Sequence, residues 1–419
     1  MTPGAVHVIG AGLAGLSAAV RLSENGVPVT LVDSAPQAGG RCRSYFDKTL
    51  GIESDNGNHL VLSGNRETMA FLDLTGSRDQ LAGPQEAAFS FVDLSDNARW
   101  TIRINDGPLG WWVMVPSRRV PGTRALDYLK LARLLRPARG ANIGETLPAS
   151  GPIWRRLLQP IMVSALNTEA SKASAALAAA VVRQSLLRGG QACRPLVATR
   201  GLSRAFVDPA LHFVSQRGGS FAAGRRLSGL GVSGGRVTEL RFADWAVPVG
   251  PKDSVILAVP PSVAGELLPD LSVPSRFNPI INGHFLAAAP PDAPAVLGVV
   301  GGIVEWIFVF ENRISVTVSN AAEWQDWPRE TLAERLWQDV SAALKLDPAL
   351  PRWQIVIEKR ATISQTPADD ALRPPAAGPW HNLFLAGDWV ATGLPATIEG
   401  AILSGRTAAT LARESMRRE

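Results

Sequence analysis

The first 33 residues alternate between apolar runs and a helical segment, and this pattern predicts a strand, a helix and a second strand. Residues 6–9 (VHVI) form an apolar run that is typical of a central parallel strand buried on both faces. A helix is expected from about Leu13 to Asn25, and residues 27–33 (VPVTLVD) follow as the second strand. This order is the opening unit of an α/β protein with a parallel sheet.

The remainder of the chain predicts two interleaved domains, which suits a length of 419 residues. We expect a Rossmann-type nucleotide-binding domain from residues 1–75, 195–265 and 375–419, and an α+β substrate-binding domain from residues 76–194 and 266–374. Strand-like runs expected in the second domain are FSFVDL, RWTIRI, NGHFLAA, WIFVFE and ISVTVS, and ASKASAALAAAVVRQSLL is strongly helical. In the first domain, GRRLSGLGVSGGRVTELRF resembles a β-meander and VILAVPP a buried strand.

Three glycines between the first strand and the helix have the spacing of a dinucleotide-binding turn. Gly10, Gly12 and Gly15 form a G-x-G-x-x-G motif. Gly10 permits the tight turn, Gly12 the close approach of a pyrophosphate, and Gly15 the close packing of helix on strand. The helix then begins at Leu13 and Ala14, and its unpaired N–H groups and positive dipole end favour phosphate.

An acidic residue completes this motif, because Asp33 ends the second strand eighteen positions after Gly15. A carboxylate at this place accepts hydrogen bonds from the adenosine ribose hydroxyls and disfavours a 2′-phosphate, so FAD or NAD is favoured over NADP. A glycine-rich turn in an ordinary α/β protein is the alternative, but such a turn requires neither the helix nor the acid.

Glycine-containing segments at both ends of the chain favour FAD over NAD. Gly39, Gly40 and Arg41 follow Asp33; paired glycines let the backbone pass close to a cofactor, and a guanidinium can pair with pyrophosphate oxygens. Near the other end, NLFLAGDWVATGLPATIEGAILSGRTAA repeats the order of buried strand, Gly-Asp turn and helix. With these motifs the chain resembles the amine oxidase and phytoene desaturase superfamily of FAD enzymes, whose nucleotide-binding domain is glutathione-reductase-like.

That resemblance implies further contacts with FAD. Asp388 would hold the ribitol or the pyrophosphate, and the helix from Ile398 would point its N-terminus toward the isoalloxazine ring. The other cofactor-binding residues that it implies are Asn56, Gly57, Asn58, Val259, Gly387, Pro395, Ala396, Thr397, Glu399, Gly400 and Ala401. Because neither Cys nor His lies between Gly387 and Ala401, we expect non-covalent FAD. A helix cap at Asp388, with glycines that serve packing, is the alternative.

Composition and charge argue against several other classes of protein. Cys42 and Cys193 are the only cysteines and form no C-x-x-C pair, so we expect neither a metal site nor a disulfide framework. The formal net charge is +5, but no nucleic-acid-binding module accompanies it, so nucleic acid is not an expected partner. No apolar run reaches membrane-spanning length and the first strand begins too early for a signal peptide, so we expect a cytoplasmic protein.

Residues 109–140 combine tryptophans, methionine and leucines with many arginines. This combination suits an interfacial segment on anionic lipid, and therefore a peripheral contact with the inner face of the cytoplasmic membrane. It suits equally a core helix with a solvated basic face, so both interpretations stay open.

Longer phrases of the chain resemble a narrower family. The phrases AGGRCRSYFD, DNGNHLVLSGN, WWVMVPSRRVPGTR, GGQACRPLVAT, GLSRAFVDPAL and EKRATISQTP are similar, in this order, to the hydroxysqualene dehydroxylases of bacterial hopanoid biosynthesis. The resemblance covers essentially the whole chain. It implies reductive removal of the hydroxyl of hydroxysqualene, a long-chain isoprenoid, to give squalene and water while FADH2 is oxidised. It implies no particular electron donor for the flavin.

Such a reaction needs an acid that protonates the departing hydroxyl. His59 is the first candidate for this donor, and Asn58 could hold the substrate oxygen; the alternative for His59 is a structural hydrogen bond to backbone or flavin. Glu305 is a second candidate, because burial in the apolar run GGIVEWIFVFE would raise its pKa. Glu399 is a third, although it could instead cap the last helix or bind the ribitol.

Three other functions share these motifs. A carotenoid-type desaturase or isomerase uses the same flavin motifs and an apolar substrate, but hydride moves in the opposite direction. An amine oxidase of this superfamily commonly frames its substrate with aromatic residues, whereas the only tyrosines here are Tyr45 and Tyr128, both far from the terminal flavin block. A flavoprotein that only carries lipid would keep the cofactor motifs and show no turnover.

Overall fold

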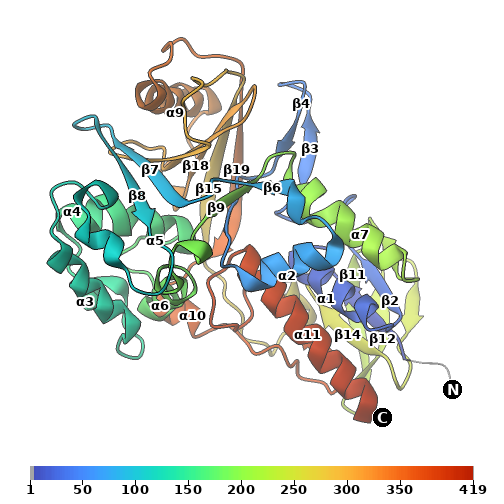
Figure 1. Ribbon diagram of the computed structural model, residues 1–419. Helices are drawn as coiled ribbons and strands as arrows, with labels where there is room; N and C mark the ends of the chain where they lie inside the picture. The colour runs from blue at the N-terminus through green and yellow to red at the C-terminus, as the bar shows by residue number, and fades with distance from the viewer. Residues whose placement is uncertain (1–3, 419) are drawn as a thin grey trace.

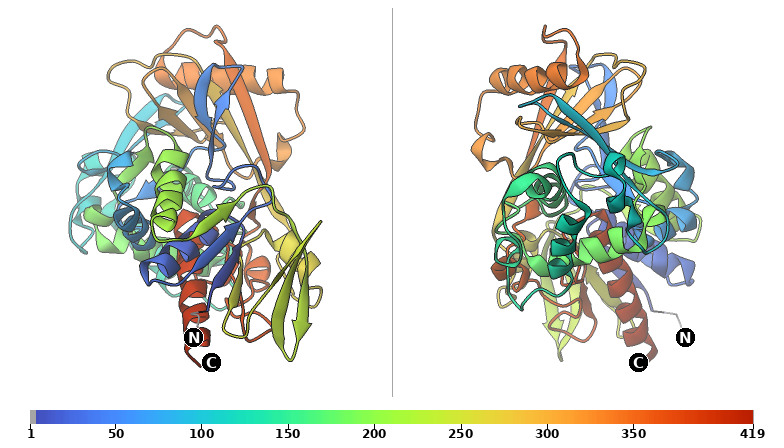
Figure 2. Two further views of the ribbon diagram at one scale, coloured as in Figure 1. Left: turned by 90° about the vertical axis from the view of Figure 1, so that its right-hand side faces the viewer. Right: turned by 60° about the vertical axis from the view of Figure 1, so that its left-hand side comes forward.

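The computed structural model describes residues 4–418 and contains two large sheets with a helical region beside them (Figure 1). One sheet, with the helix α9 against it, lies at the top of the view, and the other lies at the lower right with α1 and α11. Both views of Figure 2 keep this arrangement, so the two sheets form separate layers along the long direction of the molecule.

The lower sheet is parallel throughout and has the strand order β10-β2-β1-β14-β20. Its strands are β1 (Val6–Ile9), β2 (Val29–Val32), β10 (Ser220–Ala222), β14 (Ser254–Leu257) and β20 (Leu383–Leu385). The central strands β1 and β14 are buried at every position, because helices cover one face and further strands the other. The apolar run at residues 6–9 therefore forms the expected central strand.

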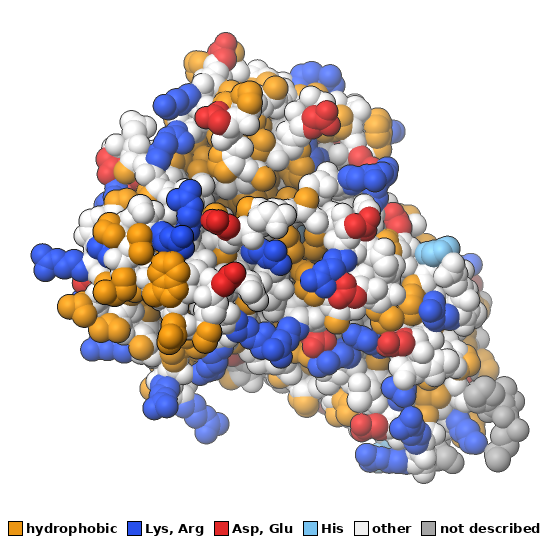
Figure 3. Space-filling view, in the orientation of Figure 1, with side chains coloured by type: hydrophobic (Ala, Val, Ile, Leu, Met, Phe, Trp, Pro, Cys, Tyr) orange, Lys and Arg blue, Asp and Glu red, His pale blue; other side chains and the backbone are white. Residues whose placement is uncertain are grey.

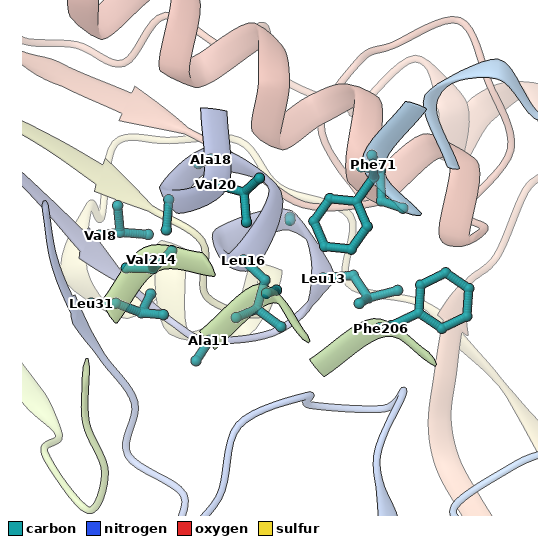
Figure 4. Close-up of a cluster of buried hydrophobic side chains, with 14 of the residues drawn as sticks. Val8, Ala11, Leu13, Leu16, Ala18, Val20, Leu31, Phe71, Phe206 and Val214 are labelled. Atoms are coloured by element: carbon teal, nitrogen blue, oxygen red, sulfur yellow. The ribbon is translucent and has the colours of Figure 1, made fainter. Parts of the chain in front are cut away.

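Helices α1 (Leu13–Glu24) and α11 (Ile398–Arg418) pack side by side against this sheet. Their approach is close: a Cβ on Gly405 would lie 2.0 Å from the carbonyl oxygen of Ala14, and the Ser17 hydroxyl donates to the Ile402 carbonyl at 2.8 Å. Figure 4 shows the apolar core below α1, where Leu13 and Leu16 meet side chains from several segments. The two ends of the chain are thus joined in one core.

The upper sheet is mixed and has the strand order β19-β15-β18-β17-β16-β7-β8. Its strands are β7 (Ala87–Asp93), β8 (Ala98–Ile104), β15 (Phe277–Phe285), β16 (Val296–Val300), β17 (Trp306–Val309), β18 (Ile314–Val318) and β19 (Trp353–Ile363). One face packs on α9 (Arg329–Leu344). The other face carries aromatic side chains, among them Phe91 and Phe308, toward the helical region.

The helical region is built from short helices between β8 and the return to the lower sheet. Its α-helices are α3 (Ile143–Thr146), α4 (Gly151–Ile153), α5 (Gln159–Leu166) and α6 (Ala175–Gln184), and a π-helical turn, η5 (Trp154–Leu158), joins α4 to α5. The segment before them contains the 3-10 helices η2 (Trp111–Met114), η3 (Pro116–Arg118) and η4 (Ala125–Leu135).

Smaller elements connect these layers. The remaining strands are β3 (Ser44–Asp47), β4 (Ile52–Asp55), β5 (Leu60–Leu62), β6 (Leu81–Ala82), β9 (Pro195–Ala198), β11 (Leu227–Ser233), β12 (Arg236–Phe242) and β13 (Ala246–Pro248). The remaining helices are α2 (Arg66–Thr75), η1 (Arg78–Gln80), η6 (Leu186–Arg188), η7 (Gly190–Ala192), the π-helical turn η8 (Ser203–Val207), α7 (Asp208–Ser215), α8 (Pro261–Leu267), η9 (Ala321–Glu323) and α10 (Pro367–Asp370).

The expected α/β class is confirmed, with a parallel sheet next to a mixed one. The strands of the parallel sheet lie within residues 1–75, 195–265 and 375–419, while the division into two domains at those bounds stays a prediction. Within residues 109–140 the structure has 3-10 turns in place of the core α-helix that was one of the two interpretations. None of the helices in residues 4–418 is both long and apolar enough to span a bilayer.

Candidate functional site

The turn after β1 has the backbone that its glycines predict. Gly10 has a φ of 106°, and a Cβ there would lie 2.4 Å from the carbonyl oxygen of Ala258, so only glycine fits. A Cβ on Gly15 would lie 1.8 Å from the carbonyl oxygen of Gly10. By contrast, no heavy atom lies within 4 Å of the position a Cβ would take on Gly12. An open space therefore borders the N-terminus of α1, where the first backbone N–H groups have no partner within the helix.

Asp33 stands beside this turn, at the carboxyl end of β2. Its carboxylate accepts hydrogen bonds from the backbone N–H groups of Ala11, at 2.6 Å, and Ala35, at 2.7 Å. These two bonds fix the carboxylate against the glycine turn. Each carboxylate oxygen has a further lone pair, so the group can still accept hydrogen bonds from ribose hydroxyls.

The Gly39-Gly40-Arg41 segment passes directly over the glycine turn. Gly39 forms a bridge with Gly12 and donates its N–H to the Ala11 carbonyl at 2.8 Å. Gly39 and Gly40 have φ values of 106° and 55°, a region that glycine enters freely and other residues rarely. A Cβ on Gly40 would lie 3.3 Å from the Cα of Gly12. The paired glycines therefore permit the close approach that the sequence indicated.

Arg41 joins the two ends of the site. Its guanidinium donates to the carboxylate of Asp388 at 2.7 Å and to the carbonyl oxygen of Ala361. The Asp388 charge raises the pKa of Arg41 further above its ordinary value. Asp388 pairs with the guanidinium, yet 44% of the surface of the Arg41 side chain stays accessible. An arginine with part of its surface free can also meet a phosphate.

The terminal block leads from β20 into α11 through a fixed loop. The Gly387 N–H donates to the Ser404 hydroxyl at 3.0 Å, and the Trp389 indole N–H donates to the Val259 carbonyl at 2.9 Å. The predicted residues Pro395, Ala396, Thr397, Gly400 and Ala401 surround the start of α11 at Ile398, as expected. Asp388 faces Arg41 rather than a helix terminus, so the capping alternative is not what the structure contains.

Glu399 lies at the start of α11, and its side chain reaches α2. Its carboxylate accepts hydrogen bonds from the backbone N–H groups of Glu67 and Thr68, at 3.0 and 2.9 Å, and from the Thr68 hydroxyl at 2.7 Å. Burial raises the pKa of Glu399, and these donors oppose that rise. The side chain therefore caps α2 and ties it to α11. It does not cap α11, the last helix, and its contact with the cofactor stays a prediction.

The turn at residues 55–59 brings the catalytic candidates next to the upper sheet. Asp55 accepts hydrogen bonds from the Ser44 hydroxyl at 2.6 Å and from the Leu202 N–H at 2.9 Å, which fixes the start of the turn. Asn56 donates to the carboxylate of Glu358 at 3.4 Å. A Cβ on Gly57 would lie 3.2 Å from the amide nitrogen of the Asn282 side chain, so the turn passes close to β15.

Asn58 belongs to a polar cluster that sequence reasoning missed. Its amide nitrogen donates to the Val316 carbonyl at 3.1 Å and to the Thr317 hydroxyl at 3.2 Å, and its backbone N–H donates to the Asn282 amide oxygen at 3.2 Å. The amide oxygen of Asn58 is buried and has no partner among the described residues. The one available signal was the polar Asn282 inside the apolar strand IINGHFL, where it is 2% exposed.

His59 is half-buried beside a small pocket. The pocket is lined by Asp55, Asn58, His59, Val197, Ala198, Leu202, Phe308 and Phe310. Burial and the positive charge of Arg41 lower the pKa of His59 to about 4. The imidazole is therefore neutral at neutral pH and holds one N–H that can donate a hydrogen bond. No hydrogen bond of this ring falls within residues 4–418.

Glu305 lies immediately before β17, and its environment matches the expectation from the sequence. Its carboxylate accepts a hydrogen bond from the Ser319 N–H at 2.9 Å. Burial raises the pKa of Glu305 to about 7, and the bond from Ser319 opposes that rise. A large share of these carboxyl groups is therefore protonated at neutral pH. The structure does not bring Glu305 and His59 into contact.

Comparisons with known proteins agree with this arrangement. The profile of the family described as flavin containing amine oxidoreductase matches residues 13–412. The hydroxysqualene dehydroxylase of Sinorhizobium fredii is 48% identical over 410 residues, which cover 98% of each chain. That of Zymomonas mobilis is 48% identical over 406 residues, 97% of this chain and 98% of the relative. The chain belongs to the hydroxysqualene dehydroxylase family of flavin-containing amine oxidoreductases.

Solved structures show that this chain shares its fold with oxidoreductases of low sequence identity. An oxidoreductase from Methanosarcina mazei has a TM-score of 0.71 at 16% identity and covers 96% of this chain and 99% of its own. A putrescine oxidase variant has a TM-score of 0.72 at 15% identity and covers 100% and 99%. Identity at this level shows the fold alone.

FAD is the cofactor of this family member, and the site fits it. Open space lies beside Gly12 for a pyrophosphate, Asp33 is fixed where a ribose is expected, and the partly accessible Arg41 can offset phosphate charge. The chain is an FAD-dependent oxidoreductase. Which of the predicted residues contact the cofactor stays a prediction.

Proposed function

We propose that this protein removes the hydroxyl group of hydroxysqualene and produces squalene and water, with FADH2 as the reductant. The observation that carries this proposal is the 48% identity to proteins named hydroxysqualene dehydroxylase over nearly the whole length of both chains. In this reaction the C–O bond of the substrate breaks, a hydride adds to carbon, and the oxygen leaves as water after it takes up a proton. Bound in its reduced form, FAD supplies the hydride.

We assign the predicted cofactor residues to FAD because of where they lie in the fold. Asp33 would accept the ribose hydroxyls, and the N-terminus of α1 with Arg41 would bind the pyrophosphate. Asp388 would act through Arg41, which it orients, and the start of α11 would border the flavin. Binding of FAD is non-covalent in this proposal.

Asn58 is the group that we assign to the substrate hydroxyl. Its amide nitrogen is held by Val316 and Thr317, so the amide cannot rotate freely. The unpartnered amide oxygen is then fixed and ready to accept a hydrogen bond from an O–H group. Asn282 and Thr317 act as positioning residues, because they bond to Asn58 and to each other.

His59 is our candidate for the donor that protonates the leaving oxygen, since it lines the same pocket as Asn58. Its low pKa means that the ring must bind a second proton before it can act as an acid. The negative pyrophosphate of FAD would partly offset the Arg41 charge that lowers this pKa. Glu305 is the competing candidate because, with a pKa of about 7, a substantial share of its carboxyl groups holds a proton at neutral pH.

Aromatic side chains next to the pocket suit the substrate and its developing charge. Phe91, Trp100, Trp306 and Phe308 form one cluster under the helical region, with Phe91 stacked on Trp100 at 5.4 Å between ring centroids. Of this buried cluster, Phe308 reaches the pocket, which Phe310 also lines. Their rings would give an apolar polyene a contact surface, and ring faces attract an allylic cation by on the order of 2 kcal/mol when water is excluded.

The deciding experiment is anaerobic reduction of the purified flavoprotein by light, followed by addition of hydroxysqualene. Reoxidation of the flavin together with one squalene for each flavin, measured by mass spectrometry, is the expected result. Without substrate the flavin stays reduced. No reoxidation, together with bleaching of the oxidised enzyme by squalene or another polyene, would make the protein a desaturase.

Hydroxysqualene is a long-chain isoprenoid alcohol, and such molecules partition into membranes because their apolar surface is large. We therefore propose that the enzyme is a cytoplasmic protein that meets its substrate at the inner face of the cytoplasmic membrane.

A further inference from the structure

One stretch of the surface is unusually apolar. Large apolar side chains are exposed at several positions between residues 109 and 129, and Leu109 and Leu126 have 78% and 73% of their surface accessible. The others are Trp111, Met114 and Leu129. Figure 3 shows hydrophobic side chains gathered at the left of the molecule, over the helical region that Figure 1 places there. Clustering of this kind is rare on soluble surfaces and marks an interaction site.

The backbone of this stretch is anchored, so the apolar side chains cannot turn inward. Asn105 accepts a hydrogen bond from the Trp112 N–H at 2.9 Å and donates to the Leu109 carbonyl at 2.8 Å. Trp112 packs edge-on against Tyr128 with 5.4 Å between ring centroids, and the Tyr128 hydroxyl accepts from the Val120 N–H at 3.0 Å. Buried residues such as Trp112 and Tyr128 fill the interior positions, and the exposed apolar side chains lie at the surface.

Basic side chains accompany the exposed apolar ones. Residues 109–140 contain seven arginines and lysines but one acidic residue, Asp127, whereas the whole chain has a net charge of +5. The positive excess of the protein is therefore concentrated in this stretch. The basic residues are Arg118, Arg119, Arg124, Lys130, Arg133, Arg136 and Arg139. Arg118 lies over the Trp111 ring, 5.0 Å from its centroid, and so keeps its charge next to an apolar surface.

We infer that this face, formed by η2, η4 and the turns between them, docks on an anionic lipid bilayer. Exposed leucine, methionine and tryptophan side chains enter the boundary between head groups and acyl chains, and the surrounding arginines and lysine pair with anionic head groups. A second copy of this chain is a poor occupant, because two faces of the same positive charge repel each other. The purpose of this docking, collection of an isoprenoid substrate, rests on the proposed function, whereas the docking itself can be measured without substrate.

The test is sedimentation of the FAD-loaded protein with vesicles. Vesicles of phosphatidylcholine alone are compared with vesicles that contain phosphatidylglycerol in addition, at low and at high salt. We expect at least ten-fold stronger binding to the anionic vesicles and a clear loss of it at high salt, because salt screens the head-group attraction. Equal binding to both vesicle types, or none to either, would overturn the inference.

Paired variants locate the surface. Leu126→Glu with Leu129→Glu should reduce binding to anionic vesicles at least ten-fold, whereas Leu350→Glu with Leu372→Glu, which adds the same charge at exposed leucines elsewhere, should have a much smaller effect. Arg133→Gln with Arg136→Gln should also weaken binding, in contrast to Arg417→Gln with Arg418→Gln at the end of α11. Flavin absorbance and thermal unfolding check that each variant folds.

Three further outcomes are decisive. If both leucine pairs reduce binding equally, the surface lies elsewhere. If light scattering shows that the wild type forms dimers which Leu126→Glu with Leu129→Glu abolishes, the face is an interface between copies and not a lipid surface. The leucine variants should turn over detergent-dispersed hydroxysqualene at the rate of the wild type. If the wild type binds vesicles but does not turn over hydroxysqualene in detergent, the proposed function is refuted and the docking inference stands.

Discussion

At the scale of single residues, Asp33 offers the simplest test of the cofactor assignment. Its carboxylate holds the N–H groups of Ala11 and Ala35 beside the glycine turn and is the expected acceptor for the ribose. Asp33→Ala should therefore purify largely free of flavin, as measured by absorbance at the flavin band relative to protein. The exposed Asp73→Ala is the control and should keep its flavin. Full occupancy in Asp33→Ala would disprove the assignment.

His59 and Glu305 can be separated by turnover. If His59 protonates the leaving oxygen, His59→Ala should keep its yellow colour and lose roughly 100-fold in turnover, the usual contribution of a general acid. Glu305→Gln should then stay within a few-fold of the wild type. The reverse result would make Glu305 the acid and leave His59 a structural residue. The fall of turnover at alkaline pH, which reports loss of the proton from the acid, should disappear only in the variant that lacks this acid.

Glu305 also makes a prediction about stability. Its pKa is about 7 in the folded protein and near its ordinary value of 4.5 when unfolded. The folded state therefore disfavours the charged form, so stability should fall as the pH rises from about 4.5 to 7, by about 3 kcal/mol in all. Glu305→Gln removes this cost and can still accept the bond from Ser319. We expect Glu305→Gln to have a higher free energy of unfolding than the wild type at pH 8 but not at pH 4.5. If the variant and the wild type differ by the same amount at both pH values, the raised pKa of Glu305 is contradicted.

At the scale of elements, α2 depends on a carboxylate that comes from α11. Glu399→Ala would leave the N–H groups of Glu67 and Thr68 and the Thr68 hydroxyl without their acceptor in a buried place. The loss should be about 2 kcal/mol in free energy of unfolding, measured with denaturant. Glu414→Ala, at an exposed position on the same helix, should change this free energy by less than about 0.5 kcal/mol. A similar small change in Glu399→Ala would show that α2 forms without this cap.

Elements whose signals are local were predictable from the sequence. The strand, the glycine turn and Asp33 lie within one short stretch, and their spacing alone indicates how they fold. The segment at residues 109–140 was harder: its mixture of apolar and basic residues suits a buried helix and an exposed surface equally, and only the packing of Trp112 and Tyr128 decides which side chains face outward.

At the scale of the whole molecule, the catalytic side of the site was beyond prediction because its parts meet only through the fold. Asn58 contacts Asn282 and Thr317, which are more than 220 positions away on two strands of the upper sheet. Glu399 lies in the flavin motif, and its contact with α2, more than 330 positions earlier, could not be read from that motif. A short motif does not predict contacts of this kind, because they depend on how distant elements pack in the folded protein.

This dependence on long-range assembly leads to a prediction about FAD and stability. The residues assigned to the cofactor come from both ends of the chain and from the turn at residues 55–59, so the unfolded chain has no site. Free FAD at about 100 times its Kd should therefore stabilise the folded state by about 2.7 kcal/mol. With an unfolding entropy of about 2.1 cal/mol/K for each of 419 residues, Tm should rise by about 3 °C. Asp33→Ala should show little of this rise, and an equal rise with NAD would show that the site does not select a flavin.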